Sequence, residues 1–276
     1  ALVTVLYSLA DTLFVGMMND QIQNAAVALA APALLAFNAV INLFGIGSSS
    51  MMSRALGRGD LKTVCASASL GFYGTVVSGA LLSALCYIFM QPFVVLLGGD
   101  INTAAATTAY MNWAVVCGAI PTILNVVMGY MVRAEGASLH ASIGTMSGCI
   151  LNMILDPFFI LPWGLGMGAA GAGLATFLSN CFACCYFFGL LMVRKKKTNI
   201  NLNPKYLSLT KEIVFAVMEV GIPAAIQNLL NVTGMTILNN FVAGYGSSAV
   251  AAVGIAQKVY MVPIQVALGG TQGVMP

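Results

Sequence analysis

Long apolar runs alternate with short polar stretches along the chain. A helix that crosses a bilayer needs about 20 consecutive apolar residues, because each residue adds about 1.5 Å and the hydrocarbon core is about 30 Å thick. The pattern predicts eight membrane helices, over residues 2–18, 25–55, 64–97, 107–132, 138–161, 168–193, 213–242 and from 249 onward. Pro121 interrupts the fourth run and Pro157 lies inside the fifth, where its missing N–H permits a kink. Since the first and last runs are cut short, we expect a fragment of a longer protein.

The composition supports an all-α, polytopic membrane helix bundle. Of the 276 residues, 59% are hydrophobic and 7% are charged, whereas a soluble domain carries about 25% charged residues. The net charge of +3 is too small to indicate a nucleic-acid partner. The Cys181-x-x-Cys184 spacing has no second cysteine pair and no nearby histidine, so packing is the preferred role and zinc is not. The sequence contains no phosphate-binding loop, metal-ligand cluster or nucleophile–base set, so we expect neither an enzyme nor a cofactor.

Basic residues predict the orientation in the membrane. Every Lys and Arg except Lys258 falls in alternate loops, and basic loops remain on the cytoplasmic side. This places the N-terminus in the cytoplasm. The basic stretch 194–212 divides the chain into a first six-helix lobe, residues 1–193, and the start of a second lobe, residues 213–276. Residues 25–30 resemble residues 249–254, as expected of a transporter built from internal repeats.

A carboxylate lies inside the fifth apolar run. Asp156 follows Asn152 by four residues, so both side chains share one helix face, and Pro157 frees a backbone carbonyl nearby. A charge at membrane depth costs at least about 2.5 kcal/mol, so such a residue usually faces a partner or a watery cavity. The arrangement predicts a cation or proton site. The alternative is a structural acid that a neighbouring helix satisfies.

Asp11 lies in the first run, one turn after Tyr7. If helices one and five pack together, Asp11 and Asp156 share a site that takes up a proton or holds Na⁺ between its carboxylates. Thr176 adds a hydroxyl unless it bonds only to its own helix. Lys258, inside the eighth run, is either a counter-ion in a central cavity or structurally paired.

The remaining polar residues have simpler interpretations. Glu135 and His140 fall beside a predicted loop, where we expect them to be solvated, and Glu219 is expected to reach the inner interface. Gly166-Met-Gly-Ala-Ala-Gly171 matches a dinucleotide fingerprint but lacks the βαβ context. Its small residues instead indicate a close approach of helices five and six.

Several motifs together resemble the multidrug and toxic compound extrusion (MATE) family over nearly the whole chain. They are Tyr7-Ser-Leu-Ala-Asp-Thr-Leu-Phe-Val-Gly16, Ser53-Arg-Ala-Leu-Gly-Arg-Gly-Asp60, Arg133-Ala-Glu-Gly136, Asn152-Met-Ile-Leu-Asp-Pro-Phe-Phe-Ile160, Gly166-Met-Gly-Ala-Ala-Gly-Ala-Gly-Leu-Ala-Thr176, Gly254-Ile-Ala-Gln-Lys258 and Gln272-Gly273. The resemblance implies two six-helix lobes and an antiporter that expels drugs and organic cations in exchange for H⁺ or Na⁺. It places the ion site at Asp11, Asn152, Asp156 and Thr176.

One departure from the family pattern narrows the branch. Some members carry an acid on helix seven where this chain has Asn231, which favours DinF-like or related bacterial branches with ion coupling in the first lobe. Tyr7, Asn231, Gln257 and Lys258 are candidates for contact with the cargo.

The sequence as a whole predicts a monomeric transporter of the bacterial inner membrane that works by alternating access on small, amphipathic, cationic cargo. A flippase of lipid-linked saccharides has a related architecture, but it should place more cationic side chains in the first-lobe helices. A membrane receptor or scaffold with structural buried acids is the other alternative.

Overall fold

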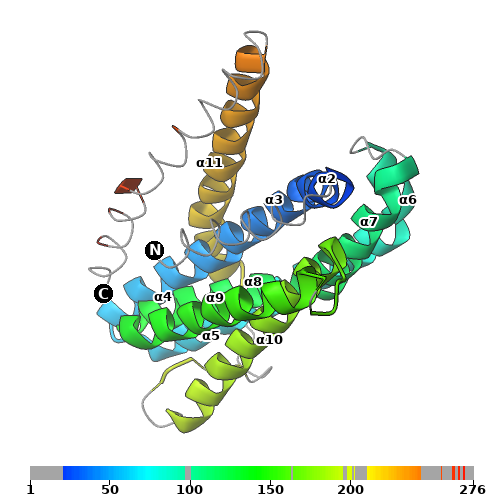
Figure 1. Cartoon of the computed structure of the whole chain (residues 1–276). Helices are drawn as coiled ribbons and strands as arrows, with labels where there is room; N and C mark the ends of the chain where they lie inside the picture. The colour runs from blue at the N-terminus through cyan, green and yellow to red at the C-terminus, as the bar shows by residue number, and fades with distance from the viewer. Residues whose placement is uncertain are drawn as a thin grey trace.

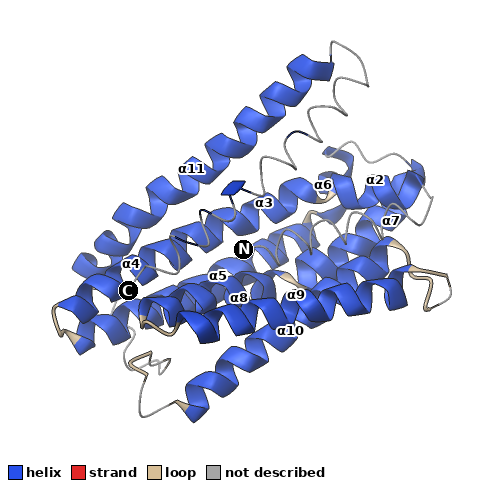
Figure 2. Ribbon diagram, turned by 60° about the vertical axis from the view of Figure 1, so that its left-hand side comes forward, coloured by secondary structure: helices blue, strands red, loops and turns tan. Residues whose placement is uncertain are grey.

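The computed structural model describes residues 21–96, 101–162, 164–194, 198–200, 202 and 210–243, with five single positions beyond them: 256, 263, 264, 267 and 270. Within these residues the regular structure is helical and contains no strand, which confirms the predicted all-α class (Figure 2). In chain order the elements are α2 (Gln21–Leu29), α3 (Ala31–Val40), η1 (Ile41–Ile46), α4 (Gly47–Gly57), α5 (Leu61–Ile88), α6 (Met90–Leu96), α7 (Ile101–Met111), η2 (Asn112–Cys117), α8 (Ala119–Ala134), α9 (Ser138–Ile160), α10 (Ala169–Val193) and α11 (Lys211–Ala243).

Five helical stretches of the described chain are long and apolar enough to cross a bilayer: Ala33–Gly57, Leu61–Ile88, Ser138–Ile160, Ala169–Val193 and Lys211–Asn231. A sixth forms if Thr103–Cys117 and Ala119–Ala134 count as one bent span. These six correspond to predicted helices two to seven. The predicted first helix and most of the eighth lie outside the described residues.

The fourth span breaks at Gly118. This is three residues before Pro121, the residue at which the sequence predicted an interruption. The two halves meet at 46°, and the π-helix η2 directly precedes the break. Because Pro121 has no N–H, the carbonyl of Cys117 loses its helical partner and the chain can bend there. An added Cβ at Gly118 would lie 2.3 Å from the Ala114 carbonyl oxygen, so the bend requires glycine.

Helices α9 and α10 run side by side along much of their length (Figure 1). An added Cβ at Gly171 would lie 2.4 Å from the carbonyl oxygen of Phe159, which confirms that small residues let these helices approach closely. The opposite face of α9 is an exposed apolar stripe suited to lipid: Leu139, Ile143, Met146, Ile150, Ile154 and Phe158. Thus α9 presents one face to the bundle and the other outward.

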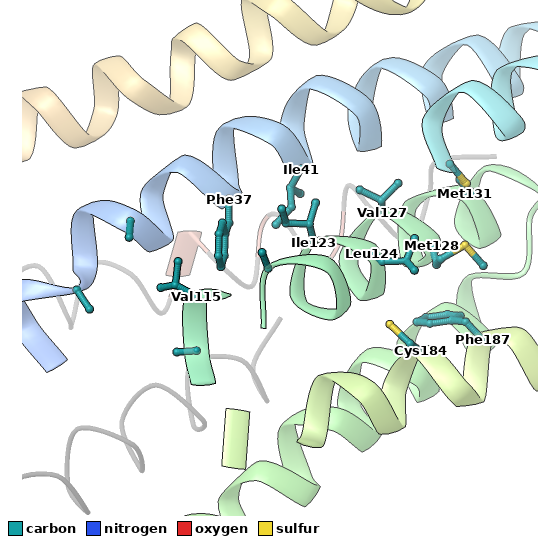
Figure 3. Packing of buried hydrophobic residues seen from close by; sticks show 14 of the residues in the cluster. Phe37, Ile41, Val115, Ile123, Leu124, Val127, Met128, Met131, Cys184 and Phe187 are labelled. Atoms are coloured by element: carbon teal, nitrogen blue, oxygen red, sulfur yellow. The ribbon is translucent and has the colours of Figure 1, made fainter. Parts of the chain in front are cut away.

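The apolar core draws on most of the helices, and one part of it fills the space between α8 and α10. Figure 3 shows Leu124 and Met128 of α8 facing Cys184 and Phe187 of α10, whereas Met131 lies on another side of α8, near Gly71 of α5. Phe187 is fully buried. An added Cβ at Gly144 of α9 would lie 2.5 Å from the Phe187 ring, so the absence of a side chain there admits the phenyl group.

Polar contacts join the end of the bundle where α8 ends and α9 begins. Glu135 is not simply solvated, as the sequence suggested. Its carboxylate accepts from Thr198 Oγ1 at 2.6 Å and from the Asn199 backbone N–H at 2.5 Å, which holds the segment after α10 against the bundle. His140 also departs from expectation, since it is half-buried in the first turn of α9 and lines a cavity of ≈ 280 Å³.

Asp60 lies outside the spans and begins α5. Its side chain accepts from the backbone N–H of Thr63, an N-cap that satisfies a free donor of the first turn. The hydrogen bond from the Thr63 hydroxyl, followed by that from its backbone N–H, lowers the pKa of this carboxyl. The acid therefore remains ionised at neutral pH.

Candidate ion-binding site

Asn152 and Asp156 lie on the buried face of α9, as their four-residue spacing predicts. Asp156 is 0% exposed and Asn152 is 2% exposed. The same face continues through Gly148 and Gly144, so α9 turns two polar and two small residues toward its neighbours. A carboxylate taken so far from solvent needs partners within the bundle.

Asn152 links Asp156 to Thr176 of α10. In one orientation its amide Nδ2 lies 3.4 Å from Thr176 Oγ1. In the other orientation, which satisfies both amide atoms, Nδ2 donates to Asp156 Oδ2 at 2.9 Å and Oδ1 accepts from the Thr176 backbone N–H at 3.1 Å. The structure therefore brings Asn152, Asp156 and Thr176 together across the α9–α10 interface.

Three further polar side chains extend this group, and the sequence reading missed them. Asn180, one turn after Thr176, donates from Nδ2 to the Thr176 carbonyl at 2.8 Å and to Thr122 Oγ1 at 3.2 Å. Asn125 of α8 donates from Nδ2 to Asn180 Oδ1 at 3.0 Å. A signal was present, since two amides inside apolar runs are costly and one of them lies four residues after Thr176.

Several predicted site residues lie outside the described part of the chain. Tyr7, Asp11, Gln257 and Lys258 are among them, so the meeting of Asp11 with Asp156 stays a prediction. Asn231 is exposed on α11. Glu219 is exposed on the same helix, about two turns from its start, where its carboxylate can reach toward the membrane interface.

The grouped side chains offer a carboxylate, amide oxygens and a hydroxyl. These are hard oxygen ligands suited to a small cation, and a buried carboxylate can equally hold a proton. Among the described residues no group of three or more His, Cys, Asp and Glu gathers to hold a metal ion. The described residues thus supply one acid with neutral oxygen neighbours.

Comparisons with known proteins show the family to which the chain is related. The sequence profile of the MatE family matches residues 1–158. The multidrug export protein MepA of Staphylococcus saprophyticus is 31% identical over 277 residues, which cover 100% of this chain and 60% of that protein. The chain thus spans about three-fifths of the length of this relative.

Two solved structures bear on the conformation. The outward-facing conformation of a multidrug resistance MATE family transporter of the MOP superfamily matches with a TM-score of 0.87 and 26% identity, over 98% of this chain and 59% of that one. The inward-facing conformation of a multidrug resistance MATE family transporter matches with a TM-score of 0.80 and 26% identity. The match covers 94% of this chain and 58% of that one. The arrangement described here is more similar to the outward-facing structure.

Proposed function

Since the chain belongs to the MatE family, we propose that it forms the ion-binding lobe, and the beginning of the second lobe, of an antiporter that exports drugs across the membrane. Entry of H⁺ or Na⁺ drives the export. The observation that carries this proposal is the buried pair Asp156 and Asn152, with the half-buried Thr176 beside them, within the spans. An acid kept at this depth has a function more often than not.

The coupling step follows from the charge of the site. A proton or sodium ion neutralises the Asp156 carboxylate, and Asn152 responds because its amide is the link between that carboxylate and α10. Loss of the buried charge changes which packing of α9 against α10 is favoured. Related transporters adopt outward- and inward-facing conformations. This supports alternating access, in which ion binding drives release of the cargo to the outside.

The cargo and setting are proposed on the same footing. The multidrug export relative supports small-molecule cargo. The largely apolar chain, with few charged residues, supports cargo that is amphipathic and cationic. The alternate basic loops support a bacterial inner-membrane protein with a cytoplasmic N-terminus. We place the lobe boundary at residues 194–212, and the working unit is a monomer that needs no cofactor beyond its coupling ion.

The test is cation-driven transport by protein expressed from the complete gene. Vesicles containing wild-type protein should accumulate a fluorescent organic cation when a proton or sodium gradient is imposed. Asp156→Asn should abolish that uptake while leaving expression and elution in detergent unchanged. Asp60→Asn is the matched control, because it neutralises an exposed acid outside the spans.

The same assay separates the alternative functions. Gradient-driven uptake that survives in Asp156→Asn rejects this assignment of the ion site. Binding of the fluorescent cation without uptake in wild-type vesicles favours a receptor. Movement of a lipid-linked saccharide between leaflets, with no uptake of the organic cation, favours a flippase.

A further inference from the structure

The polar network does not end at Thr176. It continues by one helical turn along α10 to Asn180 and crosses to Asn125 of α8, which is only 7% exposed. Asn180 uses both of its amide hydrogens, on the Thr176 carbonyl and the Thr122 hydroxyl. The Thr176 carbonyl also accepts from Ser179 Oγ at 3.0 Å, so this end of the network is closely connected.

The connections fix the orientation of Asn125. Because Asn180 points its nitrogen at two acceptors, its Oδ1 must face Asn125. Asn125 must therefore donate, and its own carbonyl oxygen is left over. That oxygen, Asn125 Oδ1, is buried and has no hydrogen-bond partner among the described residues. Reversing the Asn125 amide would place its oxygen against Asn180 Oδ1, and two oxygens cannot form a hydrogen bond. The amide orientation is therefore fixed, and Oδ1 is the atom without a partner among the described residues.

Gly148 of α9 packs beside Asn125. Gly148 lies on the same face of α9 as Asn152 and Asp156. A Cβ added there would lie 3.9 Å from Asn125 Nδ2 and 3.3 Å from the Ser179 carbonyl oxygen. The nearest neighbour of that position is the Ala183 methyl group, at 3.1 Å, so the absence of a side chain at Gly148 lets α9 pack closely against α10 beside Asn125.

The next layer closes the network. One turn beyond Gly148, Gly144 admits the ring of Phe187, which is fully buried. The titratable groups that face this layer are Asp156 at the far end and the thiol of Cys184, which donates to the Pro121 carbonyl at 3.3 Å. Among the described residues, the hydrogen-bonded path that leads from the carboxylate through Asn152, Thr176 and Asn180 ends at Asn125.

We propose that Asn125 Oδ1 is a second, inner binding position for the coupling cation, reached from the Asp156 site along the Asn152–Thr176–Asn180 path. A buried carbonyl oxygen without a donor is costly, and a monovalent cation that seeks oxygen ligands, sodium or hydronium, removes that cost. This inference rests on the proposed function and adds a ligand from a third helix, α8. Its consequence is that the ion is held by more than the carboxylate group alone.

The test compares three variants of protein expressed from the complete gene. Asn125→Leu has a similar size but lacks the oxygen. Asn125→Asp keeps it, since a protonated acid reproduces both the donor and the acceptor of the amide. Thr145→Val is the matched control, because the Thr145 hydroxyl bonds only to carbonyls of its own helix. The measured quantity is the concentration of the coupling ion that gives half-maximal uptake of the fluorescent organic cation. It is measured once with sodium and once with protons as the coupling ion.

Asn125→Leu should raise the half-saturating concentration about tenfold, as loss of one interaction with a charged species implies. Asn125→Asp should keep the wild-type value or lower it, and Thr145→Val should match wild type. A wild-type value in Asn125→Leu overturns the inner position and leaves the Asp156 site intact. An equal loss in Asn125→Leu and Asn125→Asp shows a structural role only and also overturns it. A wild-type protein that responds in neither arm defeats the proposed function and this inference together.

Discussion

The two ends of the α8–α9–α10 interface differ in kind. Toward the end of α9, the buried face carries Asp156 and Asn152, and hydrogen bonds run between the helices. Toward its start, the same face carries Gly144, and the phenyl ring of Phe187 fills the space. Both ends are equally buried, so burial does not distinguish them. The difference is that one end contains oxygen atoms that could bind an ion, while at the other end the Phe187 ring fills the space between the helices.

This contrast suggests a division of labour. A coupled transporter must hold its ion without letting it pass, because a leak would dissipate the gradient without moving cargo. In the proposed antiporter, the polar end would bind the ion and the apolar end would block its passage. This account can be tested by reducing the side chain at Phe187, by crowding it, or by weakening the hydrogen bonds of Glu135 to the segment after α10.

The largest effect is expected from removing the block. Phe187→Ala should cost about 3–5 kcal/mol of the free energy of unfolding, because a fully buried ring leaves a cavity. The variant should also leak sodium or protons into vesicles without cargo. Phe182→Ala is the control, since Phe182 lies on the outer side of the same helix and is 51% exposed. Thermal unfolding in detergent and ion flux in vesicles provide the two measurements, and a stable, tight Phe187→Ala protein would contradict the account.

A smaller effect is expected from crowding the same contact. Gly144→Ala would place its methyl group 2.5 Å from the Phe187 ring, and overpacking of this kind costs about 1–3 kcal/mol. Combining it with Phe187→Leu should recover part of that loss, because the smaller side chain leaves room for the methyl group. Gly189→Ala, which meets nothing within 4 Å, should be neutral or slightly stabilising. Purely additive losses in the double variant would show that the two residues do not press on each other.

The smallest effect is expected at Glu135, which holds the segment after α10 against the bundle. Glu135→Gln weakens two charge-assisted hydrogen bonds, to Thr198 and to the Asn199 backbone. At a half-exposed site we expect a loss of about 1 kcal/mol, which raises local opening roughly fivefold. The rate of trypsin cleavage after residues 194–197 should increase accordingly, with Glu212→Gln, an exposed acid of α11, as control. An unchanged cleavage rate would mean that the Glu135 contacts contribute little.

The spans and the face shared by Asn152 and Asp156 were predictable because they follow from local patterns. Run length gives a membrane helix, and a spacing of four residues places two side chains on one face. The interruption predicted at Pro121 appears at Gly118, because a proline frees the carbonyl four residues before it and the chain bends there.

The missed residues depend on distant partners. Glu135 meets Thr198 across 63 residues, and Asn125 meets Asn180 across 55. The local sequence marks Asn125 and Asn180 as unusual amides within apolar runs, but it does not identify the partner of either residue or that of Glu135. They become interpretable only when the helices that carry them are placed side by side.

The most direct test of the central claim is the infrared difference spectrum of the purified transporter on addition of its coupling ion. If Asp156 takes up the ion, wild-type protein should show a change in a buried carboxyl band. Asp156→Asn should lack that change, while Asp60→Asn should retain it. An identical spectrum in wild type and Asp156→Asn would contradict the account, because the ion would then bind elsewhere.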